Sequence, residues 1–222
     1  MTKFAHIPVP KLIQDAAKDF ASPIMDARRL VSIYQILYEA TTVPGQIVDL
    51  GSAPGTTALF IQQCLNELGS NRRLHCYDAF PIESLITKSC EPAKEVGCDP
   101  ENGVLLLQEA FERHDVLGPV IHPGWFANTL PDQLPQRIAF AHIDCDLYES
   151  ILEALIGVYG RMSEGAICVV DDYGLGFLPC VKKATDEFLA DKPEKIFFTV
   201  GGIQAAFVKQ EETPQFIDQL LS

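Results

Sequence analysis

Apolar residues follow two different spacings in the second half of the chain. The stretches RIAFAHID and AICVV are short, almost wholly apolar runs, and each runs directly into acidic residues. Between them, LYESILEALIGVYGRMSEG places Leu147, Ile151, Leu155 and Tyr159 at the spacing of one helix face. Strand, helix and strand in this order predict a parallel crossover unit, which is right-handed in almost all proteins.

Similar patterns predict the remaining elements. We expect further helices over residues 24–40, from Thr56 onward, over 105–117 and in VKKATDEFLAD, and strands in QIVDL, LHCYDAF, PVIH, KIFFTV and GIQAAFVKQ. Gly201-Gly202 predicts a hairpin between the last two strands. The order predicts one α/β domain over residues 1–222, built on a doubly wound, mostly parallel seven-stranded sheet with a C-terminal antiparallel hairpin. Residues 1–43 would form an N-terminal helical segment, and the aperiodic residues 81–102 an insertion.

Three acids follow the two strands of the crossover unit. Asp144 ends the first strand, and the pair Asp171-Asp172 ends the second. Parallel strands deliver their carboxyl ends to one edge of the sheet, where open α/β sheets bind ligands. Three carboxylates gathered there repel one another, and a hard divalent cation such as Mg²⁺ relieves that repulsion. The acids therefore predict a metal site, against the alternative that each is a helix cap or turn residue.

A glycine turn follows the first strand. In DLGSAPG, Asp49, Gly51, Ser52 and Gly55 lie between strand and helix, where glycines let a backbone approach a nucleotide closely. Asp78 ends the second strand, where an acid accepts the hydroxyls of a ribose. These residues predict a nucleoside-bearing cofactor. The spacing differs from the G-x-G-x-x-G of dinucleotide folds and favours S-adenosylmethionine over NAD, because a sulfonium cofactor has no pyrophosphate to hold.

Charge and composition exclude several classes of binding partner. Seventeen basic against thirty acidic residues give a net charge of −13, which argues against nucleic acid and anionic membranes as partners. MTKFAHIPVP lacks the apolar core of a secretory signal, and no stretch approaches the length of a membrane helix. The seven cysteines contain no CxxC pair. We therefore expect a cytoplasmic, disulfide-free protein that acts on a small molecule.

Several longer motifs are specific enough to suggest a family. HPGWFANTLP, HIDCDLYESILEAL, CVVDDYG and PCVKKATDEFL, over roughly residues 104–190, resemble the macrocin O-methyltransferase (TylF-type) family of Mg²⁺-dependent, S-adenosylmethionine-dependent enzymes. VPGQIVDLGSAPG matches more loosely, because the family usually has an aromatic-Arg-Gly-Gly sequence there. The resemblance implies that Asp144, Asp171 and Asp172 hold the metal and that Asp144 is the base for the substrate hydroxyl. It also implies a hydroxylated acceptor, preferably a sugar, and assembly into dimers or larger oligomers.

Other residues near these motifs have two interpretations each. Gly124 and Trp125 would lie beside the adenine of the cofactor, or Trp125 would anchor the core. Asp146 would face the cofactor or cap the following helix. We expect structural roles for His75 and His142, and contact between the substrate and the loop over residues 173–179. The competing functions are a catechol or phenol O-methyltransferase of the same fold, an NAD-dependent oxidoreductase, and a non-catalytic nucleoside-binding protein.

Overall fold

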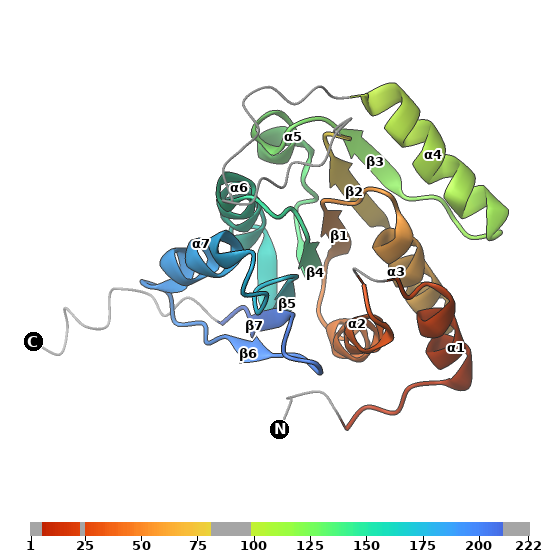
Figure 1. Ribbon diagram of the computed structural model, residues 1–222, viewed down its shortest axis with the longest axis horizontal. Helices are drawn as coiled ribbons and strands as arrows, with labels where there is room; N and C mark the ends of the chain where they lie inside the picture. The colour runs from red at the N-terminus through yellow and green to blue at the C-terminus, as the bar shows by residue number, and fades with distance from the viewer. Residues whose placement is uncertain (1–5, 23–24, 81–98, 211–222) are drawn as a thin grey trace, which may run out of the picture.

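A seven-stranded sheet with helices on both faces forms the protein. The computed structural model describes residues 6–22, 25–80 and 99–210. The strands lie in the order β3-β2-β1-β4-β5-β7-β6, and β7 runs antiparallel to both of its neighbours (Figure 1). The first five strands of this order are parallel. The structure thus confirms the predicted doubly wound sheet and its antiparallel C-terminal hairpin.

Helices and strands alternate along the chain. The helices are α1 (Lys11–Asp19), α2 (Ala27–Ala40), α3 (Thr56–Glu67), α4 (Pro100–Arg113), α5 (Phe126–Gln133), α6 (Tyr148–Tyr159) and α7 (Pro179–Leu189). The strands are β1 (Gln46–Leu50), β2 (Leu74–Asp78), β3 (Val120–Pro123), β4 (Ile138–Ile143), β5 (Met162–Val170), β6 (Phe197–Phe198) and β7 (Ala205–Val208).

Two apolar cores sandwich the sheet. One joins one face of the sheet to α1, α2, α3 and α4, and the other joins the opposite face to α5, α6 and α7 (Figure 1). Every residue of β4 is buried, because helices cover both of its faces. This explains why its sequence is an unbroken apolar run rather than an alternating one.

The strand register aligns the carboxyl ends of four neighbouring strands. Tyr77, Leu50, Ile143 and Val170 lie side by side across β2, β1, β4 and β5. The residue after each one continues this row, and backbone hydrogen bonds hold the row together, from Gly51 N to Tyr77 O, Asp144 N to Leu50 O and Asp171 N to Ile143 O (2.8–2.9 Å). The fold therefore brings four residues to one edge, namely Asp78, Gly51, Asp144 and Asp171.

The structure also corrects several expectations. Residues 11–19 form a helix within the segment over residues 1–43 that we expected to be helical, and α5 adds a helix directly after Trp125 that the sequence patterns did not predict. Helix α2 begins at Ala27 rather than residue 24, because the Asp26 side chain caps it. Helix α4 begins at Pro100, inside the predicted insertion, with Asp99 as its cap. Residues 81–98 of that insertion lie outside the described part of the chain.

Cysteine pairing differs from the prediction. Cys64, Cys76, Cys145 and Cys168 are free, but Cys180 at the start of α7 is disulfide-bonded. The expectation of a disulfide-free chain is therefore wrong, because the absence of a CxxC pair does not exclude a bridge between cysteines distant in sequence. Among the described helices, none is long and apolar enough to cross a membrane.

A stack of rings lies at the β2–β3 end of the sheet. His122 is parallel to Tyr77 at 4.3 Å between ring centroids, and its Nε2 lies 3.0 Å from Nδ1 of His75. Burial, and then the neighbouring His122 and Arg73, lower the pKa of His75 to about 4. His75 therefore becomes protonated near pH 6.5 in the unfolded chain but only near pH 4 in the folded protein.

We expect the free energy of unfolding of His75→Phe to fall less than that of the wild type as the pH is lowered from 6.5 to 4. Because the folded-state pKa of His75 is lowered, its contribution is complete above pH 6.5 and is lost as the pH falls toward 4. After allowance for partial exposure, the loss is on the order of 1–2 kcal/mol. Urea unfolding of both proteins between these pH values measures it, and equal pH slopes would contradict the assignment.

Candidate active site

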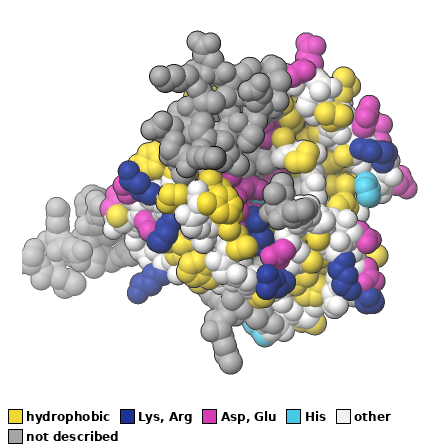
Figure 2. Space-filling model, viewed as in Figure 1, with side chains coloured by type: hydrophobic (Ala, Val, Ile, Leu, Met, Phe, Trp, Pro, Cys, Tyr) yellow, Lys and Arg dark blue, Asp and Glu magenta, His cyan; other side chains and the backbone are white. Residues whose placement is uncertain are grey.

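A cavity of about 190 Å³ opens at the carboxyl edge of the sheet. Its lining includes Gly51 and Asp78 from the first two strand ends, Trp125 from the start of α5, and Asp144 and Asp146 after β4. Figure 2 shows acidic side chains gathered in a hollow near the centre of one face, with hydrophobic side chains nearby. The glycine turn and Asp144 thus meet at one cavity, whereas Asp171 and Asp172 lie outside its lining.

Gly51 is required at the point where β1 and β4 approach each other. Its φ is +86°, and a Cβ placed there would lie 1.9 Å from the backbone oxygen of Asp144. A side chain at this position would therefore force the two strand ends apart. Gly55 also has a positive φ of +100°, and a Cβ there would meet Leu107 of α4 at 2.5 Å.

Asp78 fixes the glycine turn from the neighbouring strand. Its Oδ2 accepts a hydrogen bond from the backbone N–H of Ala53 at 2.9 Å, and its Oδ1 accepts one from Phe80 at 2.5 Å. Burial raises the pKa of Asp78 despite these hydrogen bonds. Asp78 therefore lines the cavity and also orders the loop beside it.

Four acids surround the strand ends of β4 and β5. Asp144, Asp146 and Asp172 each have a carboxylate oxygen within 4.8 Å of those of the other two. Ligand atoms of Asp144, Asp171 and His142 also all lie within 4.8 Å of one another. Asp146 and Asp172 both adopt positive φ angles, +57° and +56°, which are uncommon for residues other than glycine. The backbone therefore adopts unfavourable conformations that bring these carboxylates together.

Mutual repulsion and burial shift the ionisation of these acids. Burial, and then Asp171, raise the pKa of Asp144 well above its ordinary value, and the same two causes raise the pKa of Asp172 to about 7. The pKa of Asp146 is raised in the same way. That of Asp171 is lowered, although burial opposes this, because His142 and Arg29 stabilise its charge. The cluster thus contains more acidic groups than His142 and Arg29 balance, and its surroundings favour the protonated forms of Asp144, Asp146 and Asp172.

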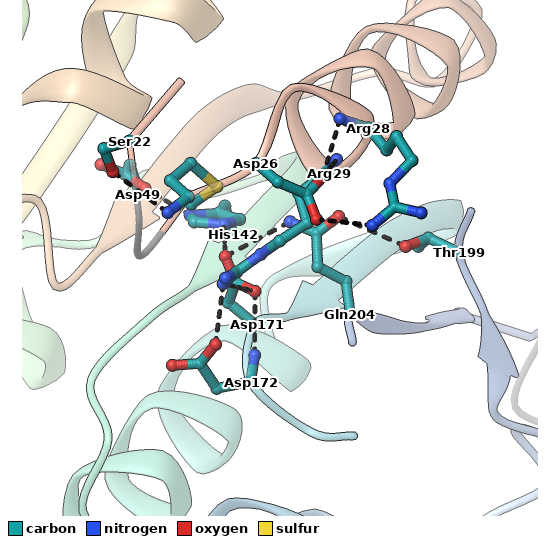
Figure 3. A network of polar contacts seen from close by, with 11 residues as sticks. Ser22, Asp26, Arg28, Arg29, Asp49, His142, Asp171, Asp172, Thr199 and Gln204 are labelled. Atoms are coloured by element: carbon teal, nitrogen blue, oxygen red, sulfur yellow. Dashed lines mark hydrogen bonds and ion pairs between the residues drawn. The ribbon is translucent and has the colours of Figure 1, made fainter. Parts of the chain in front are cut away.

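A network of buried polar side chains supports Asp171 from behind (Figure 3). Nδ1 of His142 lies 2.7 Å from Oδ1 of Asp49, and its Nε2 lies 3.5 Å from Oδ2 of Asp171. Gln204 of the hairpin donates to the same oxygen of Asp171 at 3.3 Å. Arg29 of α2 pairs with Asp171 and, at 2.8 Å, with Asp172. Burial opposes a charge on His142, but its contacts with the carboxylates of Asp171 and Asp49 raise its pKa to about 10.

The structure separates the residues that were expected to bind the cofactor. Gly51, Asp78, Gly124, Trp125 and Asp146 line the cavity. Three others lie outside the cavity lining, with Asp49 buried against His142, Ser52 hydrogen-bonded to the Asp49 carbonyl at 2.9 Å, and Gly55 against α4. Trp125 is 42% exposed, so it does not anchor the core. Asp146 does not cap α6, whose N-cap is Leu147.

Arg29 is the functional candidate that the sequence interpretation missed. It lies on α2 at the same helical spacing as the buried residues Ile33, Ile36, Leu37 and Ala40. An arginine on an otherwise apolar helix face is the signal that would have found it, because such a charge needs an acidic partner in the core.

The fold and the site together define a class. A sheet of this order, with an antiparallel strand between β5 and β6 and a glycine turn after β1, is the arrangement of Rossmann-like methyltransferases. Among solved structures, the O-methyltransferase NovP has the same fold, with a TM-score of 0.71, 23% sequence identity, and coverage of 89% of this chain and 88% of that chain.

Sequence comparison identifies the family. The model of the Macrocin-O-methyltransferase (TylF) family matches residues 14–200, and the chain belongs to this family of S-adenosylmethionine-dependent methyltransferases. A tetracenomycin-C rhamnosyl 4'-O-methyltransferase of Streptomyces olivaceus is 32% identical over 145 residues, 61% of this chain and 56% of the relative. Demethyldecarbamoylnovobiocin O-methyltransferase of Streptomyces niveus is 28% identical over 181 residues, 77% of this chain and 68% of the relative. The chain thus spans little more than half the length of the first relative.

Proposed function

We propose that this chain is a single catalytic domain that transfers a methyl group from S-adenosylmethionine to a hydroxyl of a glycosylated natural product, with a divalent cation, preferably Mg²⁺. The observation that carries the proposal is the shared cavity, in which Gly51 and Asp78 lie beside Asp144 and Asp146, two members of the acid cluster. Membership of the TylF family supports the reaction class. The names of the relatives, which are O-methyltransferases of a rhamnosyl tetracenomycin-C and of demethyldecarbamoylnovobiocin, support the acceptor class.

The proposed cofactor site joins the first glycine turn to α5. Gly51 would let the backbone approach the cofactor, and Asp78 would accept hydrogen bonds from its ribose hydroxyls. Gly124 and the half-exposed Trp125 would form the wall against the adenine, since an indole ring stacks well on a purine. Asp49, Ser52 and Gly55 would shape the turn from behind, and Asp146 would lie at the boundary with the acids.

The proposed metal ligands are Asp144, Asp171 and Asp172, and Asp146 lies close enough to Asp144 and Asp172 to join them. The fit rests on donor chemistry, because clustered carboxylate oxygens are the hard ligands that Mg²⁺ prefers. A bound Mg²⁺ would stabilise the alkoxide form of the acceptor hydroxyl.

Asp144 is proposed as the general base. It lines the cavity where the acceptor hydroxyl would lie, so its carboxylate would be placed to take the hydroxyl proton. The remaining task of the chain is to align oxygen, methyl and sulfur for an in-line displacement, and such positioning supplies about 7–11 kcal/mol in favourable cases.

The loop after the acid pair is proposed to contact the acceptor. Phe177 in this loop is 69% exposed, and Phe198 of β6 is 47% exposed and packs edge-on against Tyr173. Exposed aromatic side chains would suit an acceptor that joins a sugar to an apolar ring system. Assembly into dimers or larger oligomers belongs to the same proposal and rests on the family resemblance alone.

Calorimetric titration of S-adenosylhomocysteine, in Mg²⁺ and then in EDTA, tests the proposed function. We expect binding under both conditions, because the cofactor residues other than Asp146 are separate side chains from the metal ligands. Turnover of glycoside and phenol acceptors should then require Mg²⁺. Binding of NAD instead of S-adenosylhomocysteine would contradict the reaction class. A preference for phenols would contradict the glycoside assignment and favour a phenol O-methyltransferase.

A further inference from the structure

Arg29 lies between the two acids of the Asp171–Asp172 pair (Figure 3). Its Nη2 donates to Oδ1 of Asp171 and, at 2.8 Å, to Oδ1 of Asp172. The Arg29 side chain is only 5% exposed. One guanidinium therefore holds both carboxylates of the pair that the proposed function assigns to a divalent cation.

Helix α2 and the sheet register bring Arg29 to this position. Asp26 accepts hydrogen bonds from the backbone N–H groups of Arg28 and Arg29, so the helix begins directly before them. Ile47, Phe140 and Val169 belong to the apolar core between the sheet and α2. Residues two positions apart in a strand point to the same face, so Asp49, His142 and Asp171 lie on the face that α2 covers. The first turn of α2 is thus fixed above the acids.

The charged side chains divide into an inner and an outer group. The inner group is Asp49, His142, Asp171 and Arg29, in which two acids and two cations balance and each side chain is at most 5% exposed. The outer group is Asp144, Asp146 and Asp172, whose oxygens lie within 4.8 Å of one another. Arg29 links the groups, because it belongs to the inner one and pairs with Asp172 of the outer one.

We propose that Arg29 is the resident counter-ion of the Asp171–Asp172 pair and competes with the divalent cation for it. The inference rests on the proposed function, which supplies the metal. In the metal-free protein, Arg29 neutralises the pair and keeps these buried acids in place. In the metal-bound protein, Arg29 and the cation share the charge of the pair. Arg29 is then a positioning residue that sets how tightly the metal is held.

Removal of Arg29 has two opposing effects on metal affinity. It loosens the acid pair, which weakens binding, and it removes a positive charge close to the metal, which strengthens binding. The first effect is small, because His142, Gln204 and the backbone N–H of Asp172 still hold Asp171. The second is large, because charges in contact at a partly buried site are weakly screened. We therefore expect tighter metal binding without Arg29.

The test compares Arg29→Met with a matched control, Arg28→Met. Arg28 is the preceding residue of α2, but its side chain is 67% exposed and pairs with Asp26. Mg²⁺ is titrated calorimetrically into each metal-free, full-length protein, and thermal unfolding is recorded in EDTA and in Mg²⁺. In Arg29→Met we expect Mg²⁺ affinity to rise at least about tenfold. We also expect a lower Tm in EDTA that Mg²⁺ restores, whereas Arg28→Met should behave as the wild type.

Arg29→Lys keeps the test decisive if Arg29→Met does not fold in EDTA. Lysine retains the charge but cannot bridge two carboxylates in the same way, so its Mg²⁺ affinity should lie between those of the wild type and Arg29→Met. Unchanged or weaker Mg²⁺ affinity in the Arg29 variants would overturn the competition alone. Absence of Mg²⁺ binding in every protein would overturn the competition and the metal assignment together. Failure to bind S-adenosylhomocysteine would instead refute the methyltransferase function.

Discussion

Replacing Asp144 with Asn is expected to abolish most turnover and to stabilise the metal-free protein. The amide has the shape of the carboxyl group but cannot accept a proton or carry charge, so loss of the proposed base should lower kcat about 10²–10⁴-fold. Burial and the neighbouring acids already raise the pKa of Asp144 well above its ordinary value. Asparagine imitates the neutral form that this environment favours, and it removes repulsion from Asp171 and Asp172.

Three measurements check this prediction together. Turnover is followed at saturating Mg²⁺, S-adenosylhomocysteine affinity by calorimetry, and Tm in EDTA. Cofactor affinity should stay within about threefold, since Asp144 carries no proposed cofactor contact. Asp132→Asn on the exposed surface of α5 is the matched control and should leave all three values unchanged. Near-normal turnover in Asp144→Asn would refute the base assignment, and a lower Tm in EDTA would refute the account of its pKa.

The sequence predicted the strands of the site because two signals agreed there. A buried parallel strand is an unbroken apolar run, and an acid at its end can only lie at the carboxyl edge. The register then places Asp144 beside Asp171, as the crossover argument required. Hydrophobic periodicity and connection order were therefore enough to predict which strand ends meet.

Long-range polar contacts were beyond this reasoning. Periodicity says which face of an element is buried, but not which buried group from a distant element lies opposite. Asp49 was assigned to the cofactor, yet its carboxylate faces His142, and His142 in turn faces Asp171. Three strands had to be placed in register before this chain of contacts became visible. Arg29 depends further on the packing of α2 over the sheet.

The division into an inner and an outer group of charged side chains explains how the fold tolerates so many acids at one edge of the sheet. The inner acids are matched by His142 and Arg29, and a buried pair is tolerated when both partners are present. Burial and mutual repulsion favour the protonated forms of the outer acids and so raise the pKa values of Asp144 and Asp172. A divalent cation bound as proposed would compete with protons at Asp144 and with Arg29 at Asp172.

Replacing Gly51 with Ala is expected to disrupt both halves of the active site at once. The new methyl group would lie 1.9 Å from the backbone oxygen of Asp144, at a φ of +86° that non-glycine residues rarely adopt. Neither strand end can yield alone, because hydrogen bonds join Gly51 N to Tyr77 O and Asp144 N to Leu50 O. Backbone strain and overpacking together cost about 2–6 kcal/mol, a large share of the stability of a domain.

Urea unfolding and S-adenosylhomocysteine titration of Gly51→Ala measure these effects, with Gly118→Ala as the control. A Cβ at Gly118 meets no atom within 4 Å, so that variant should keep wild-type stability and cofactor affinity. Protein that remains folded in Gly51→Ala should lose cofactor and Mg²⁺ affinity together, because one backbone contact positions both the glycine turn and Asp144. Loss of cofactor affinity with unchanged Mg²⁺ affinity would contradict that coupling, since it would mean that the acids keep their positions independently of the turn.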